Sequence, residues 1–169
     1  MARDPLPCRL ATLPRTQAAL LAACGGSTAP ASTTVVAVDG GDLDGVYRAM
    51  SLVRLGALLA GADETLKWRL IAEFLEEYRW EPHGTRYELL ETEPASTSDE
   101  HWDVFLAALA EHLAARDGRA APAWVESRSL RRFWFPFNTP AARVDAVVHA
   151  PAAFRRRGVY VAAQELEVA

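Results

Sequence analysis

Hydrophobic residues recur every three or four positions through the middle of the sequence, which is the spacing of one face of an α-helix. The stripe is clearest after Asp63, whose side chain can accept a hydrogen bond from a backbone N–H at a helix start. Its members are Leu66, Leu70, Ile71, Phe74, Leu75 and Tyr78, opposite Lys67, Glu73, Glu76 and Glu77. Pro82 and Gly84 follow and would close the segment. The pattern predicts an amphipathic helix that begins at Asp63 and ends before Pro82.

A second strong helix is predicted from Thr97 and Glu100, which have the spacing of a capping box. One face of it would carry Trp102, Phe105, Leu106, Leu109 and Leu113. Gly118 stands just past its end, where a left-handed residue is favoured. Thr85 and Glu88 repeat the capping-box spacing and predict a short helix through Leu89 and Leu90.

Weaker patterns flank these two helices. Before them, a helical face is predicted that ends near Gly61 and consists of Val46, Met50, Val53, Ala57 and Leu58. After them we expect a short helix over Ser127–Phe135 and another over Ala141–His149, with Val144, Val147 and Val148 facing inward. A last helix would begin at Pro151 and end at Gly158, followed by an extended stretch at 159–161 and a short turn over 164–168.

These elements predict a mainly α fold: a single compact domain of about five to seven helices over residues 42–169. Residues 1–41 form a low-complexity segment, loosely packed, with a short helix predicted over Arg15–Cys24 and a β-branched run at 34–38. The predicted core comprises Leu70, Phe74, Tyr78, Trp102, Phe105, Leu109, Leu113, Phe133, Trp134 and Phe154.

The composition is that of an ordinary globular protein, with 50% hydrophobic and 24% charged residues in 169. The apolar stretch Ala18–Cys24 is at the short end of what a signal peptide needs, and no run approaches the roughly 20 residues that span a bilayer. Cys8 and Cys24 form neither a disulfide framework nor a zinc-ligand pattern. We therefore expect a cytoplasmic protein without contact to a membrane.

Charge is strongly segregated along the chain. Residues 63–118 carry fourteen acidic and five basic residues, whereas residues 119–157 have a net charge of +6. Segregation of this kind favours a charged partner, although solvated helix faces or pairing between the two segments would also explain it. The acidic candidates for binding a protein are Glu73, Glu76, Glu77 and Glu81. The basic candidates for binding nucleic-acid phosphates are Arg128, Arg131, Arg132, Arg155, Arg156 and Arg157.

Catalytic motifs are not evident. His101 and His112 would share a helix face but lie roughly 16 Å apart along its axis, too far for one metal ion. The glycine pairs lack the lysine of a phosphate-binding loop and the spacing of a dinucleotide fold. Phe133 or Trp134 could stack on bases beside the arginines, but the run at 133–137 is apolar enough to be core instead. We expect no catalytic residue, no metal and no cofactor, and hence not an enzyme.

From about Tyr47 to Ala169, nearly three quarters of its length, the chain resembles a family of uncharacterised actinobacterial proteins. The stretches that carry the resemblance are Arg69–Arg79, Trp102–Ala114 and, most distinctively, His149–Val161. Members look like the antitoxin or regulatory half of a pair whose other half resembles a nucleotidyltransferase-like toxin. Some members carry a helix-turn-helix ahead of this region, a pattern that residues 1–45 do not show.

Two functional hypotheses follow. The resemblance implies a non-catalytic interaction protein, an antitoxin-like or regulatory binder of a nucleotidyltransferase-like partner, whose basic active site the acidic segment could cover. The alternative is a transcriptional regulator that binds DNA or RNA through its arginine-rich C-terminal third. The sequence leaves the oligomeric state open.

Overall fold

The computed structural model describes residues 48–167, and within that range the chain is mainly helical, with no strand. The predicted fold class is therefore confirmed. The described residues belong to one compact unit, Gly45–Ala169. The helix predicted over Arg15–Cys24, the run at 34–38 and Val46 lie outside the described residues.

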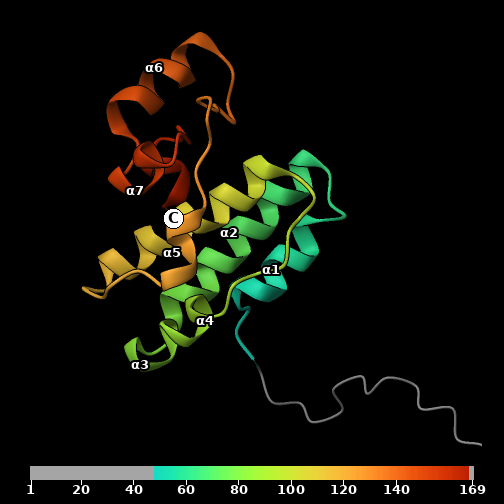
Figure 1. Ribbon diagram of the computed structural model, residues 1–169, viewed down its shortest axis with the longest axis vertical. Coiled ribbons are helices and arrows are strands. Elements are labelled where there is room, and N and C mark those ends of the chain that lie inside the picture. Colours follow the sequence, from blue (N-terminus) through green and yellow to red (C-terminus); the bar gives the residue numbers. More distant parts are fainter. Residues whose placement is uncertain (1–47, 168–169) are drawn as a thin grey trace, which may run out of the picture. The chain divides into compact units, whose positions relative to one another are not determined.

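The central element is α5, which spans Glu100–Arg116 (Figure 1). Most of its residues are buried, from Trp102 through Ala114, because neighbours cover it on several sides. It contacts α1 (Leu52–Leu59), α7 (Ala152–Arg156) and the 3-10 helix η1 (Ala123–Ser127). The small side chains of Ala107, Ala108 and Ala110 allow those elements to approach closely. The segment with the clearest sequence pattern is thus the axis of the core.

Helix α2 spans Glu64–Trp80 and packs against α1. It begins as predicted, because Asp63 Oδ1 accepts a hydrogen bond from the Leu66 N–H at 2.8 Å. Its buried face contains Ile71, Phe74, Leu75 and Tyr78. The stripe does not extend over the first turn, however, since Leu66 is 43% exposed. Two short helices follow, α3 (His83–Arg86) and α4 (Glu88–Glu91).

Both predicted capping boxes are wrong. Helix α5 is capped by Asp99, whose side chain accepts from the His101 N–H at 2.9 Å. Thr97 is buried instead in the preceding loop, where its hydroxyl donates to Asp103 Oδ1 at 2.8 Å. Thr85 lies inside α3, and its hydroxyl donates to the Pro82 carbonyl at 2.9 Å. A cap needs the hydroxyl oxygen to accept an N–H of the first helical turn, and neither threonine does so here, since Asp99 caps α5 and Tyr87 precedes α4.

The buried face of α1 also differs from the prediction. Val53 and Leu58 are exposed, whereas Leu52, Leu55 and Leu59 are fully buried. In an eight-residue helix this rich in leucine, two faces satisfy the helical period equally well. The choice is made by the neighbours α2, α4 and α5, and by Gly56, which lies against Pro94.

The helix predicted over Ser127–Phe135 is absent from the described structure. Between η1 and Pro140 the chain has no helix, and Trp134 pairs with Val159 in an isolated parallel bridge. The Trp134 N–H donates to the Gly158 carbonyl, and the Tyr160 N–H donates to the Trp134 carbonyl, both at 2.9 Å. Because a distant segment satisfies these backbone groups, the local sequence gives no sign of the conformation.

The predicted core is largely confirmed, with one error. Phe133 is 70% exposed and does not belong to it. Leu70 and Trp134 are half-buried and pack against the core. The remaining predicted members are buried, namely Phe74, Tyr78, Trp102, Phe105, Leu109, Leu113 and Phe154.

Helix α6 (Pro140–His149) is capped by Thr139 and lies beyond the end of the core helices (Figure 1). The valines that were expected to face inward face outward: Val144 is 66%, Val147 51% and Val148 61% exposed. Helix α7 follows, then Gly158 in the left-handed region at φ 82°, and a 3-10 helix η2 (Ala163–Leu166). The predicted inward face of α6 is therefore wrong, since the small Ala146 occupies that side.

Candidate functional site

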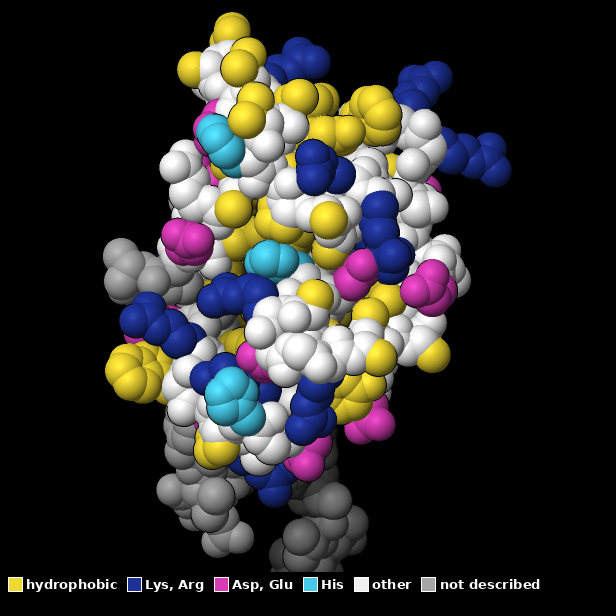
Figure 2. Space-filling model, turned by 90° about the vertical axis from the view of Figure 1, so that its left-hand side faces the viewer, with side chains coloured by type: hydrophobic (Ala, Val, Ile, Leu, Met, Phe, Trp, Pro, Cys, Tyr) yellow, Lys and Arg dark blue, Asp and Glu magenta, His cyan; other side chains and the backbone are white. Residues whose placement is uncertain are grey.

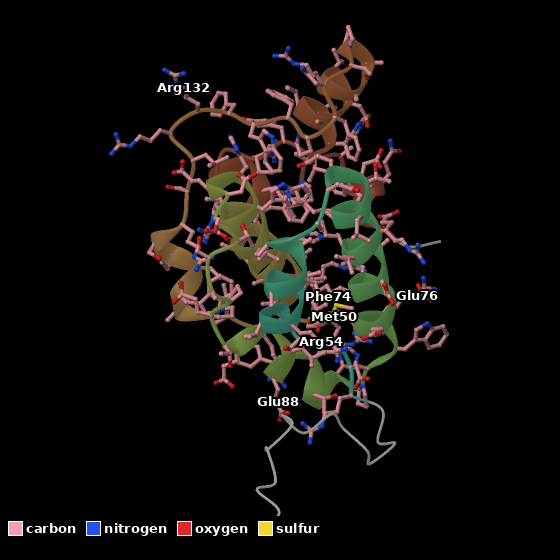
Figure 3. The ribbon with its side chains drawn as sticks, turned by 90° about the vertical axis from the view of Figure 1, so that its right-hand side faces the viewer. Met50, Arg54, Phe74, Glu76, Glu88 and Arg132 are labelled. Carbon is pink, nitrogen blue, oxygen red and sulfur yellow. The ribbon has the colours of Figure 1, made fainter. Side chains whose placement is uncertain are left out.

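The four acidic candidates all lie on or just after the C-terminal half of α2, but they are not equally available. Glu73 is exposed. Glu77 accepts a hydrogen bond from the Met50 N–H at 2.6 Å and so fixes the chain that enters α1. Glu76 accepts from the Trp80 indole N–H at 2.9 Å and lies on the side of α2 away from Phe74 (Figure 3). Glu81 accepts from the Thr85 hydroxyl at 3.3 Å. This group is therefore partly committed to the fold.

Arg157 and Arg128, two of the six basic candidates, hold the C-terminal third together. Arg157 is only 3% exposed; its Nε donates to Glu111 Oε2 at 2.9 Å, and its Nη1 donates to the carbonyls of Val125 and Arg128. Arg128 donates to Glu93 at 2.7 Å and to the Pro94 carbonyl at 3.1 Å. These guanidinium groups are internal ties between distant segments.

The other basic candidates separate into two kinds. Arg156 forms ion pairs with Glu111 at 2.7 Å and Glu126 at 3.4 Å. Arg131, Arg132 and Arg155 are exposed and form no ion pair with any residue in the described part of the chain. Figure 3 shows Arg132 projecting from its loop, away from the helices. The six arginines therefore do not converge on one phosphate-binding surface, and pairing with the acidic segment accounts for Arg128, Arg156 and Arg157.

A surface that the sequence analysis missed lies at the α6 end of the molecule. Its apolar residues are Phe133, Val144, Val147 and Val148, and its basic residues are Arg131, Arg132 and Arg143; we call these residues together the α6 surface. The helical spacing of Val144, Val147 and Val148 is visible in the sequence, but a stripe of this kind predicts a buried face.

Ring contacts join the two parts of the α6 surface. The Arg143 guanidinium lies over the Phe135 ring, 4.8 Å from its centroid. Phe135 stacks on Tyr160 with centroids 5.1 Å apart, and Phe133 meets the same tyrosine edge-on at 5.2 Å. These contacts link Arg143 of α6 to Phe133 on the preceding loop. Figure 2 shows hydrophobic and basic side chains gathered at this upper end of the molecule.

A polar cavity of about 270 Å³ lies where the C-terminal ends of α2 and α5 meet. Within it the Tyr78 hydroxyl donates to Asp117 Oδ2 at 2.7 Å, and Arg86 donates to Asp117 Oδ1 at 3.2 Å. Burial, together with the hydrogen bond to Asp117, raises the pKa of Tyr78, so the phenol keeps its proton. Arg86 also donates to the Arg79 and Glu81 carbonyls. The network ties helix ends together and presents no activated nucleophile.

Within residues 48–167, no group of three or more His, Cys, Asp or Glu side chains is arranged to hold a metal ion. None of the helices in the same range has the length and apolar character required to cross a bilayer. Comparison with protein-family models, with characterised proteins and with solved structures finds no match to this chain.

Proposed function

We propose that this chain is a non-catalytic interaction protein that binds a partner protein through the α6 surface. The observation that carries the proposal is the outward apolar face of α6. Fully burying one valine side chain contributes roughly 1.5–3 kcal/mol, and the fold leaves about half or more of this contribution unrealised at Val144, Val147 and Val148. Contiguous exposed apolar residues with a polar rim are typical of protein-binding sites.

The composition of the α6 surface supports a protein partner. Aromatic residues and arginine are enriched in protein interfaces, where they contribute a large share of the binding energy. Phe133 is 70% exposed, yet its ring is positioned by Tyr160. Arg143 is oriented by its contact with Phe135. Side chains that are ordered before binding lose little conformational entropy on association.

The resemblance described above suggests the class of partner. We propose that it is a nucleotidyltransferase-like protein of the same cytoplasm, with this chain in the antitoxin-like or regulatory role. The excess of acidic residues over 63–118 supports this assignment, because a basic, nucleic-acid-handling active site would attract such a segment. Glu73 is the exposed member of the α2 acidic group that could contribute.

The test is co-expression with the product of the neighbouring gene, followed by size-exclusion chromatography. We expect one complex of defined stoichiometry. The double variant Val144→Gln/Val148→Gln should abolish co-elution, whereas the matched variant Val53→Gln/Leu58→Gln, on an exposed face of α1, should leave it intact. Separate elution of the wild-type proteins would contradict the proposed partner, and equal effects of the two variants would contradict the proposed surface.

Nucleic-acid binding is the second candidate, and one observation favours it. Arg131 and Arg132 directly precede the exposed ring of Phe133, an arrangement in which a base could stack while the guanidinium groups contact phosphates. A gel-shift experiment with fragments of the gene's own promoter tests it. Binding that weakens steeply as salt rises and disappears in Arg131→Ala/Arg132→Ala would support this function.

A further inference from the structure

Three arginines line the cavity where the C-terminal ends of α2 and α5 meet. They are Arg79, Arg86 and Arg116, and the cavity has a volume of about 270 Å³. Arg79 and Arg116 lie in the last turns of α2 and α5, where the carbonyl end of a helix favours a positive charge. Arg86 comes from a separate element, α3. Three helices therefore bring positive charge to one small volume.

Arg86 is ordered by the fold and still keeps free donors. Its Nε donates to the Glu81 carbonyl, its Nη1 to Asp117 Oδ1 and its Nη2 to the Arg79 carbonyl. A guanidinium group has five N–H bonds, so two of those of Arg86 remain without a partner among the described residues. The side chain is already held in place, and it would lose little conformational entropy when it binds a ligand.

Two carboxylates also line the cavity and offset part of its positive charge. Asp117 accepts from Arg86 at 3.2 Å and from the Tyr78 hydroxyl at 2.7 Å, so its charge is engaged within the fold. Glu167 is exposed, where water and salt screen its charge. Three guanidinium groups and two carboxylates leave one positive charge in excess in the lining.

The carbonyl groups at the two helix ends do not occupy Arg116. At the end of α5, three carbonyls accept the backbone N–H groups of residues 117–119. At the end of α2, two carbonyls accept from Arg86. The Arg116 side chain itself forms neither a hydrogen bond nor an ion pair with any residue between 48 and 167. Its guanidinium group is therefore available to a ligand.

This arrangement fits a small oxyanion. The fork of a guanidinium group matches two oxygens of a carboxylate or a phosphate, and such charge-assisted hydrogen bonds are stronger than neutral ones. The lining also contains the buried side chains of Leu75, Leu113 and Leu166. The volume is below the range of roughly 300–1,000 Å³ that is typical of pockets for drug-sized ligands. The cavity therefore suits a small molecule.

We propose that this cavity binds a small molecule through a phosphate or carboxylate group, with Arg86 and Arg116 as the donors. Arg79 adds a third positive charge to the same lining. The inference does not depend on the function proposed above, because the cavity is lined by α2, α3, α5 and the C-terminal segment and not by α6.

The test is isothermal titration calorimetry of the full chain with inorganic phosphate and, separately, with acetate at constant ionic strength. We expect saturable binding of at least one of the two anions at a single site. The lower of the two dissociation constants assigns the bound group as phosphate or as carboxylate. Absence of saturable binding with both anions would overturn the proposal.

Variants locate the binding in the cavity. Arg116→Gln should weaken it by about tenfold or more, because a charged donor is lost. The control Arg155→Gln removes an exposed arginine outside the cavity and should leave the affinity unchanged. Equal effects of these two variants would contradict the proposed site.

Removal of a carboxylate should have the opposite effect. Asp117→Asn should tighten binding by about threefold or more, because Arg86 loses its internal anion. Glu167→Gln should act in the same direction, and its exposed side chain makes it the safer variant if Asp117→Asn does not fold. Circular dichroism verifies the fold of each variant. Weaker binding in a folded Asp117→Asn or Glu167→Gln protein would overturn the assignment of an anion.

Discussion

At the scale of single residues, the charged side chains divide into those that hold the fold and those that face solvent. Three arginines follow one another at 155–157, yet Arg155 is exposed, Arg156 is half exposed and Arg157 is buried. Only a structure separates them, because the partners of Arg157 are Glu111 and two carbonyls far away in sequence. The sequence shows the cluster of charge but not which member points inward.

Arg157→Met is expected to destabilise the protein by about 3–5 kcal/mol, since it removes one member of a buried ion pair and leaves the Val125 and Arg128 carbonyls without their donor. Arg156→Met is the matched control, because that side chain is 50% exposed and its pairs are worth about 1 kcal/mol or less. Urea unfolding measures both. Equal losses would show that the burial of Arg157 has no energetic consequence.

His112 should make stability depend on pH. Burial lowers the pKa of its imidazole, and Arg116 one turn further lowers it again. The unfolded chain therefore binds a proton at higher pH than the folded chain does, so stability is complete above the ordinary value of 6.5 and decreases as pH falls below it. His112→Gln should flatten this part of the curve. An NMR titration of His112 with a midpoint at or above 6.5 would contradict the prediction.

At the scale of elements, the long helices follow from their own sequences, whereas the short ones depend on their neighbours. Asp63 caps α2 as expected, and α5 is recognisable from its aromatic and leucine face. Helix α1 turns a different face to the core from the one predicted. Its eight residues carry leucines on more than one side, so helical spacing alone does not identify the buried face. Its orientation brings Gly56 against the loop before α5.

That close approach makes Gly56 a sensitive position. A Cβ added there would lie 2.9 Å from Pro94 Cβ and 3.4 Å from Leu106 Cδ1. Gly56→Ala should therefore destabilise by about 1–3 kcal/mol, although alanine favours helix by roughly 1 kcal/mol. Gly61→Ala, with nothing within 4 Å of the added Cβ, should be neutral or slightly stabilising. Thermal melts of the two variants check this; a stabilised Gly56→Ala protein would mean that the loop moves without cost.

At the scale of the whole molecule, burial is distributed unevenly over residues 48–167. The core cluster draws on α1, α2, α4, α5, η1, α7 and the segments after α7, but not on α6. Helix α6 is attached by Ala146, by the Asp145–Gln164 hydrogen bond and through the Phe135 and Phe137 rings that flank its start. The helix proposed to bind a partner thus contributes no residue to the core cluster.

Native-state hydrogen exchange should reveal this difference. Amides of α5 are expected to exchange only through global unfolding, because that helix is enclosed by the core. Amides of α6 should exchange faster, by local opening, because few apolar contacts oppose it. Binding of a partner to the α6 surface would slow α6 selectively. Equal protection of α5 and α6 in the unbound protein would contradict this distribution of stability.

The sequence by itself determined the mainly helical class, the positions of α2 and α5, and most of the large residues of the core. Those features depend on local periodicity and on burial that any helical packing requires. Tertiary structure alone decided which face of α1 is buried, which arginines are internal and that α6 turns its valines outward. These outcomes depend on contacts between segments far apart in the chain, and an apolar stripe looks the same in a sequence whether the fold itself or a partner covers it.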